Sequence, residues 1–182
     1  MPPFSMAAHV LPDVLCQGLL VVFCGTAAGT VSASRGAYYA GPGNRFWRII
    51  AEIKLTPRRL QPDEFRLFPT FGIGLTDIAK SAAGADSELP VGSFDVEGFT
   101  KRIRAVRPKI VAFNGKRAGG AFFGIPRTVD LAYGPCSPPM PDFPAVFVLP
   151  STSGAASGSW SADPWRELAA LIHSAWDAGR EN

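Results

Sequence analysis

Three short apolar runs, separated by segments with helical spacing, constrain the fold of this chain most. They are Leu19–Cys24, Lys109–Phe113 and Ala145–Leu149. Each run has the length of a strand and is followed by small, polar or turn-forming residues, which is typical of a strand buried on both faces. Strands that alternate with helices predict a parallel sheet covered by helices on both sides. The expected fold is therefore three-layer α/β/α, with a central, mostly parallel sheet.

The segments between these runs carry helix and turn signals. Asn44 is expected to cap a helix whose apolar face begins at Phe46. Residues 61–68 read as a short helix that Pro69 stops, and residues 71–78 as a strand or extended loop interrupted by glycine. Residues 80–92 are rich in Ala, Gly and Ser and are predicted to be a surface loop. Ser93 is expected to cap the helix that follows.

Composition limits the class of protein. A chain of 182 residues, 47% hydrophobic and 18% charged, suits one folded domain, with Met1–Asp13 as a loose N-terminal arm. A net charge of +3 permits nucleic-acid binding without requiring it. Three widely spaced cysteines and two histidines favour neither a disulfide framework nor a metal site, so no metal or cofactor is expected. Without a leader or a membrane-spanning run, we expect a cytoplasmic monomer with no membrane partner.

Small and polar residues follow each predicted strand. They form the segments Gly25-Thr26-Ala27-Ala28-Gly29, Thr76-Asp77, Asn114-Gly115-Lys116 and Ser151-Thr152-Ser153-Gly154. Ligands of open α/β sheets bind at the carboxyl ends of the strands. We therefore expect these segments to converge on one cleft. Small residues after Gly25 would let a flat ligand approach the backbone, and Tyr38 or Tyr39 could stack on it. An ordinary strand–loop–helix connection remains the alternative interpretation.

Several of these segments resemble one known family. VVFCG, AGPGNRFW and GKRA are similar to motifs of the mismatch-specific branch of the uracil-DNA glycosylase superfamily, and YYAGPGNRFW and LPSTS are similar to its hypoxanthine-DNA glycosylase branch. The resemblance runs from about Leu15 to the last predicted helix. It implies that a damaged nucleotide in single- or double-stranded DNA is flipped into a pocket and that water then replaces its base. It implies no metal.

The first motif departs from the family pattern at the residue that positions water. The mismatch-specific branch has asparagine where this chain has Ala27, and alanine cannot orient water. Two residues are candidates to replace it. Asp77 could orient or deprotonate water and offset positive charge on the sugar. Asn44 matches an asparagine that the resemblance assigns to catalysis. Each also has a purely structural interpretation, as a turn former or a helix cap.

The resemblance also implies contacts to the flipped base. Tyr39 matches the aromatic residue that stacks on the base, with Tyr38 as support or a steric gate, and Phe46 lies in the same matched segment. Asn114 could pair with a carbonyl and an N–H of uracil, because an amide offers both an acceptor and a donor. The remaining base-binding candidates form the wall after the first strand: Gly25, Thr26, Ala27 and Ala28.

Two further segments are candidates to contact DNA. Lys116 could reach a phosphate, although a solvated lysine explains it equally well. The loop matching the second family motif pushes into the duplex and comprises Ser151, Thr152, Ser153, Gly154, Ala155 and Ala156. Residues that fill the vacated stack are usually bulkier than alanine. We therefore expect weak plugging, little dependence on the opposite base and similar cleavage of single- and double-stranded DNA.

The sequence is compatible with four functions. The first is a monofunctional glycosylase that removes uracil. The second removes hypoxanthine, because the small residues from Gly25 to Gly29 leave room for a purine. With Ala27 in the first motif, the protein could instead bind damaged DNA without cleaving it. An unrelated nucleotide-binding α/β domain would explain the strand ends but not the paired motifs.

Overall fold

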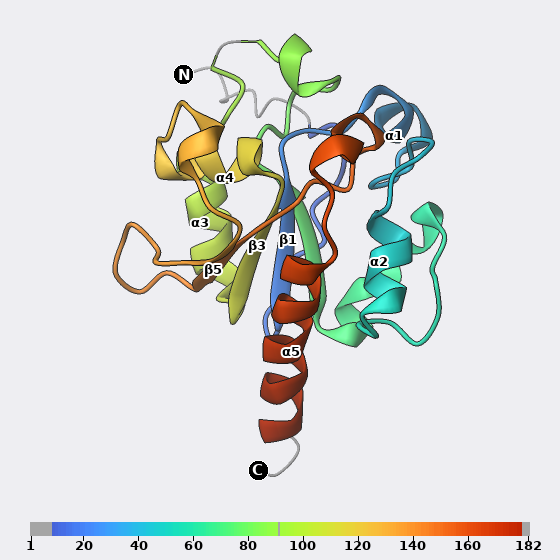
Figure 1. The fold of residues 1–182 in the computed structure, drawn as a ribbon, viewed down its shortest axis with the longest axis vertical. Coiled ribbons are helices and arrows are strands. Elements are labelled where there is room, and N and C mark those ends of the chain that lie inside the picture. The colour runs from blue at the N-terminus through green and yellow to red at the C-terminus, as the bar shows by residue number, and fades with distance from the viewer. Residues whose placement is uncertain (1–8, 91, 180–182) are drawn as a thin grey trace, which may run out of the picture.

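The computed structural model describes residues 9–90 and 92–179, which build a layered α/β domain around one sheet (Figure 1). The described strands run in the order β2-β1-β3-β5-β4, and all pairs are parallel except β4 with β5. The predicted α/β fold with a mostly parallel sheet is confirmed. The strands are β1 (Val21–Gly25), β2 (Ile73–Asp77), β3 (Ile110–Asn114), β4 (Gly134–Cys136) and β5 (Ala145–Leu149).

Helices cover both faces of the sheet. They are α1 (Thr30–Arg35), α2 (Phe46–Glu52), α3 (Val96–Val106), α4 (Lys116–Phe123) and α5 (Asp163–Ala178), with short 3-10 helices at Pro62–Phe71, Asp86–Glu88, Thr128–Asp130 and Gly154–Ser159. Within the part of the chain that the structure describes, every helix is too short or too polar to span a membrane.

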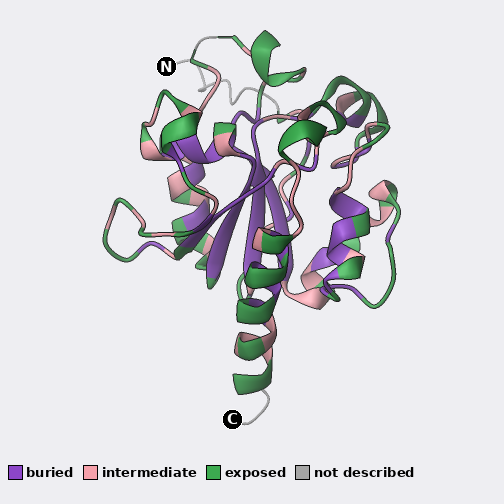
Figure 2. Ribbon diagram, in the orientation of Figure 1, coloured by how far each residue is buried: buried purple, intermediate pink, exposed green. Residues whose placement is uncertain are grey.

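Strands β1 and β3 are buried along their whole length, as their apolar runs predict (Figure 2). Side chains of β1 alternate between two cores: Val21 and Phe23 pack with α2 and α5, whereas Val22 and Cys24 pack with α3 and α4. This alternation follows from the two-residue period of a strand. Because β2, β1, β3 and β5 run parallel, their carboxyl ends lie at one edge of the sheet.

Some local predictions are wrong. Pro69 lies inside the 3-10 helix that it was expected to stop. The N-cap of α3 is Asp95, whose Oδ1 accepts a hydrogen bond of 2.8 Å from the Gly98 N–H, whereas the Ser93 hydroxyl donates to the Pro90 carbonyl. The composition of residues 80–92 predicted a surface loop, but Lys80 is buried. Strand β4 was not predicted, because three residues including a proline give no strand pattern.

The predicted loose arm, Met1–Asp13, lies partly outside the described residues. Its last five residues are described and pack against the sheet. Leu11 is 1% exposed, and the next segment continues into a bridge between Val14 and Leu75 of β2. The Val10 N–H donates a hydrogen bond of 2.8 Å to the Lys80 carbonyl. This segment therefore lies directly behind the end of β2.

Candidate active site

A cavity of about 640 Å³ opens at the carboxyl edge of the sheet. It lies where the chain order reverses, since β2 adds to one side of β1 and β3 to the other. Ligands of open α/β sheets bind at such a reversal. Every candidate site residue except Phe46 lines this cavity: Gly25, Thr26, Ala27, Ala28, Tyr39, Asn44, Asp77, Asn114, Lys116, Ser151, Thr152, Ser153, Gly154, Ala155 and Ala156.

Asp77 and Gly25 form the floor of the cavity. They are register partners at the ends of β2 and β1. A Cβ built on Gly25 would lie 2.6 Å from Asp77 Oδ1 and 3.3 Å from the Tyr39 hydroxyl. Only glycine therefore lets the carboxylate and the phenol approach this strand end. The main-chain carbonyls of Gly25 and Thr26 accept hydrogen bonds from Ile78 and Ala79, which fixes the loop against the residues after Asp77.

Burial makes Asp77 an unusual carboxylate. The side chain is 4% exposed, and burial raises the pKa of Asp77 to about 6. Lys80 and Arg102 act in the opposite direction and lower this pKa, while the negative charge of Asp13 raises it. A carboxyl group with a pKa near neutral pH can accept a proton from water, which is the property that a general base requires.

Tyr39 is strained and its hydroxyl is unpaired. Its backbone has a φ of 52°, in the left-handed region that a tyrosine rarely adopts. The ring stacks on Phe46 with centroids 4.0 Å apart. The hydroxyl is buried and makes no hydrogen bond of standard geometry among the described residues. Burial raises the pKa of the Tyr39 hydroxyl, whereas its polar neighbour, the side-chain amide of Asn114, lowers it. Strain and an unpaired buried donor at one residue are typical of a binding site.

Phe46 does not reach the cavity. It is fully buried and packs with Phe23, Trp47 and Trp165 in the core beneath Tyr39. We predicted Phe46 as a base-binding residue because it lies in the same matched segment as Tyr39. The structure instead makes it the support on which the Tyr39 ring rests.

Asn44 lies at the rim of the cavity and fixes the start of α2. Its Oδ1 accepts a hydrogen bond of 3.0 Å from the N–H of Phe46, the first residue of the helix, although Arg45 is the N-cap residue. No hydrogen bond in the described part of the chain uses the amide nitrogen of Asn44, so this group is available to a ligand. The structural and ligand-binding interpretations of Asn44 are therefore compatible.

Asn114 has a structural function that the sequence did not predict. Its Oδ1 accepts a hydrogen bond of 3.0 Å from the Thr152 N–H, and its Nδ2 donates to the Thr152 hydroxyl at 2.9 Å. The amide thus ties the end of β3 to the loop after β5. One N–H and one lone pair of Asn114 remain for a base. Thr152 itself is 1% exposed, so it anchors the loop rather than presenting its side chain to DNA.

Comparison with known proteins identifies the family. The uracil DNA glycosylase superfamily matches residues 12–171 of this chain. The chain belongs to the uracil-DNA glycosylase superfamily. Among solved structures it is similar to the solution NMR structure of a candidate uracil DNA glycosylase from Methanosarcina acetivorans, at 22% identity, with a TM-score of 0.59 and coverage of 91% of this chain and 96% of that chain. At this identity the structural likeness supports the fold. The family implies hydrolysis of an N-glycosyl bond in DNA.

Basic groups of this glycosylase-family protein line one side of the cavity. Lys116 and Arg117 begin α4, and both are held over aromatic rings: Lys116 Nζ lies 4.4 Å from the Tyr133 ring centroid and Arg117 lies 5.3 Å from that of Phe94. Backbone N–H groups at the start of a helix favour anions. This side of the cavity suits an anionic group such as a phosphate.

The opposite side includes residues that the sequence did not suggest. Leu11 and the segment from Gly84 to Glu88 complete the wall. The Gly84 N–H donates a hydrogen bond of 2.9 Å to the Ala28 carbonyl, which brings this segment against the first motif. No sequence pattern links these distant positions. Within the described residues, no group of three or more His, Cys, Asp or Glu side chains could hold a metal ion.

Proposed function

We propose that this protein is a monofunctional DNA glycosylase that removes uracil by hydrolysis and leaves an abasic site. The observation that carries the proposal is the Asp77 carboxylate at the floor of the cavity, beside a glycine that leaves it room. The missing asparagine of the first motif, replaced by Ala27, makes another water-orienting group necessary. Asp77 is the buried acid among the cavity residues and is the best candidate for it.

Tyr39 and the loop after β1 would hold the base. Phe46 supports one face of the Tyr39 ring, and we assign the other face to the flipped base. Stacking on an aromatic ring contributes about 1–3 kcal/mol per base. The unpaired Tyr39 hydroxyl and the free amide N–H groups of Asn44 and Asn114 could donate to the base carbonyls. These donors would stabilise the negative charge that develops on the leaving base.

Asp77 would act on the sugar side of the bond that breaks. As a carboxylate it would hold the attacking water and offset the positive charge that develops on the sugar. As the water adds, its proton passes to the carboxylate or to solvent, and the base leaves with the electron pair of the glycosyl bond. No covalent bond to the protein is needed, which is what makes the proposed activity monofunctional.

Hypoxanthine is the second candidate substrate. Thr26, Ala27 and Ala28 form a wall of small side chains in a cavity of about 640 Å³, which leaves room for a purine as well as a pyrimidine. Both bases present a carbonyl beside an N–H to the same donors.

Single-turnover release of the base tests the proposed function. Matched oligonucleotides would carry uracil, hypoxanthine or mispaired thymine, each single- and double-stranded. Release of uracil that leaves alkali-labile abasic sites without strand cleavage supports the proposal. Release of hypoxanthine alone would contradict uracil as the substrate and support hypoxanthine, the second candidate. Binding of all three without release would overturn both and indicate a damage-binding protein.

A further inference from the structure

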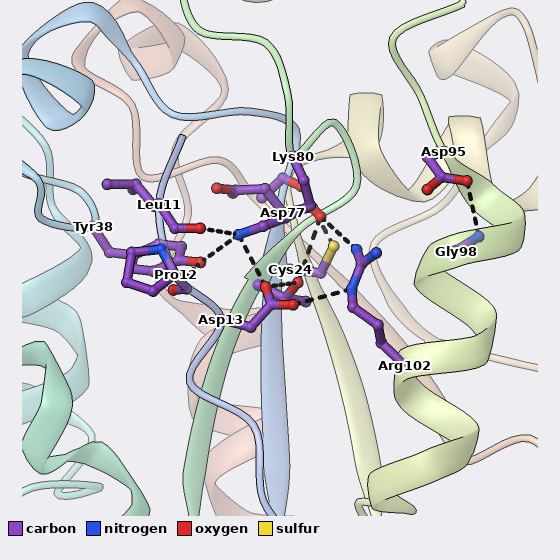
Figure 3. Close-up of polar contacts among 12 residues, drawn as sticks. Leu11, Pro12, Asp13, Cys24, Tyr38, Asp77, Lys80, Asp95, Gly98 and Arg102 are labelled. Atoms are coloured by element: carbon purple, nitrogen blue, oxygen red, sulfur yellow. Dashed lines mark hydrogen bonds and ion pairs between the residues drawn. The ribbon is translucent and has the colours of Figure 1, made fainter. Parts of the chain in front are cut away.

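A buried network of charges lies behind Asp77 (Figure 3). Its centre is Asp13, from the segment before β1. Asp13 Oδ1 lies 2.9 Å from Lys80 Nζ and accepts a hydrogen bond of 2.7 Å from the Thr76 hydroxyl, and its Oδ2 lies 3.1 Å from Arg102 Nε. These residues come from the N-terminal segment, the end of β2, the turn after it and α3.

Lys80 is fully engaged by this network. It is 5% exposed, and its ammonium group donates to the Leu11 carbonyl at 2.6 Å and to the Tyr38 hydroxyl at 3.0 Å, in addition to its ion pair with Asp13. Burying an ammonium group without partners is strongly unfavourable. Such a residue, three positions after Asp77, is not explained by solubility or surface charge.

Arg102 reaches the same strand end from the other side. Its guanidinium donates a hydrogen bond of 3.1 Å to the main-chain carbonyl of Asp77, while Thr76 is held by Asp13. The two residues at the end of β2 are therefore fixed by side chains that do not line the cavity. Two carboxylates and two cations gather here, so the cluster is electrically balanced only when Asp77 is charged.

We propose that Asp13, Lys80 and Arg102 are positioning residues that hold the end of β2. In this arrangement Lys80 and Arg102 keep Asp77 charged for the reaction, and Asp13 holds these two cations in place. The inference rests on the proposed function, in which Asp77 acts as a carboxylate. None of the three touches the substrate; they act through Asp77. The alternative is a structural ion cluster that only fastens the N-terminal segment to the sheet.

The other titratable groups around Asp77 remain neutral. Burial raises the pKa of the Cys24 thiol and of the Tyr38 and Tyr39 hydroxyls, and the charge of Asp77 raises each further. The groups that carry charge beside Asp77 are therefore Asp13, Lys80 and Arg102. Lys80 and Arg102 lower the pKa of Asp77, and Asp13 raises it.

This arrangement predicts opposite effects of two substitutions. Lys80→Met removes a positive charge, so the acidic limb of the rate–pH profile moves to higher pH. Asp13→Asn removes a negative charge, so that limb moves to lower pH. We expect each displacement to be about half a pH unit or more. The measurement is single-turnover uracil release between pH 5 and 9, with DNA affinity measured in parallel and expected to stay unchanged.

Matched variants separate this function from folding. Lys101→Met removes an exposed cation that is adjacent in sequence to Arg102 and pairs with Glu97 at the surface, and it should leave the profile unchanged. Lys80→Arg should restore the profile that Lys80→Met displaces. If Lys80→Met does not fold, Arg102→Gln, at a less buried side chain, should displace the limb in the same direction. Equal loss of rate at every pH in both charge variants would overturn the proposal.

A titration independent of activity distinguishes this inference from the proposed function. The carboxyl carbon of Asp77, assigned by its loss in Asp77→Asn, can be followed by NMR against pH. If the titration midpoint moves in opposite directions in Lys80→Met and Asp13→Asn, the network is supported. If the same protein releases no base, the proposed function is refuted while the network remains supported. A midpoint that neither substitution moves would overturn the network, whatever the activity.

Discussion

The Asp77 carboxylate occupies space that any side chain on Gly25 would need. The two residues end neighbouring parallel strands in register, and a Cβ on residue 25 would lie 2.6 Å from Asp77 Oδ1. Atoms at that distance cannot coexist, so the carboxylate would have to turn away. The glycine and the acid therefore form one unit, in which the first strand leaves room for a group supplied by the second.

Gly25→Ala should disable the site while the fold persists. The methyl group displaces the Asp77 carboxylate and presses on the Tyr39 hydroxyl, so we expect uracil release to fall by at least about 10-fold, or about 1.4 kcal/mol in activation free energy. Gly29→Ala is the matched control, because Gly29 lines the same cavity and a Cβ there meets nothing within 4 Å. If Gly25→Ala released uracil as fast as Gly29→Ala and the wild type, Asp77 would have no role in the mechanism.

Asp77→Asn should lower the rate of base release and raise the free energy of unfolding. The folded pKa of about 6 lies above the value of about 3.9 for an unfolded aspartate, so the native state binds more protons between those pH values. The free energy of unfolding of the wild type therefore falls as pH rises through this window, by about 3 kcal/mol in total from this group. Asparagine avoids that cost. The variant should be more stable than the wild type at pH 8 and should lose this advantage below pH 4.

Denaturant unfolding at pH 4, 6 and 8 measures this difference. Base release by Asp77→Asn should fall by about 100-fold or more, in the range of general acid–base contributions. Asp86→Asn, an acid at the mouth of the cavity, serves as the control for both measurements. A stability difference that does not depend on pH would mean that Asp77 titrates normally.

The strand ends of this site were predictable because they follow a local pattern. The apolar runs are followed by Gly25, by Asn114 and, after Pro150, by Ser151, and the geometry of a parallel sheet brings such ends together. The same reasoning placed Asp77 near Gly25 although the strand before it is interrupted by glycine. These predictions depend on residues adjacent in sequence and on one topological rule, so one sequence was sufficient.

The supporting contacts could not be predicted because they join distant segments. Lys80 lies in a polar, Ala-rich stretch and its partners Leu11 and Asp13 are far away in the chain, so its composition indicated a surface loop. The hydrogen bonds between Asn114 and Thr152 also join distant segments. The sequence did not reveal them, because either amide atom of Asn114 could equally well bind a base. Long-range polar pairs leave no periodic signal in a single sequence.

Tyr39→Phe should weaken the reaction without weakening the fold. The Tyr39 hydroxyl has no partner in the described residues, and a buried unpaired hydroxyl costs about 1–3 kcal/mol. Removing it should leave the melting temperature unchanged or raise it, while base release falls by about 10-fold through loss of a donor. Tyr38→Phe gives the contrast, because its hydroxyl bonds to Pro12 and Lys80 and its loss should lower stability. A Tyr39→Phe enzyme with full activity would restrict Tyr39 to stacking.

Two substitutions separate the two functions of Asn44. Serine keeps an oxygen that can accept the Phe46 N–H, whereas alanine removes both this acceptor and the free amide. We expect Asn44→Ala to lower stability by about 1 kcal/mol and Asn44→Ser to lower it by much less. If the amide contacts the substrate, both variants should lose uracil release to a similar extent. Full activity in Asn44→Ser would show that Asn44 only fixes the helix.

The loop after β5 should make the protein indifferent to the strand opposite the damaged base. Thr152 anchors this loop, and Ala155 is among its exposed residues. The methyl group of Ala155 cannot fill a vacated base stack. We therefore expect single- and double-stranded uracil substrates to be cleaved within about threefold of each other, since one methyl group stabilises the flipped state by less than about 1 kcal/mol. Ala155→Leu supplies a wedge and should speed duplex cleavage alone, with Ser157→Leu on the same loop as the control. Strong preference of the wild type for uracil opposite guanine would show that another residue reads the partner strand.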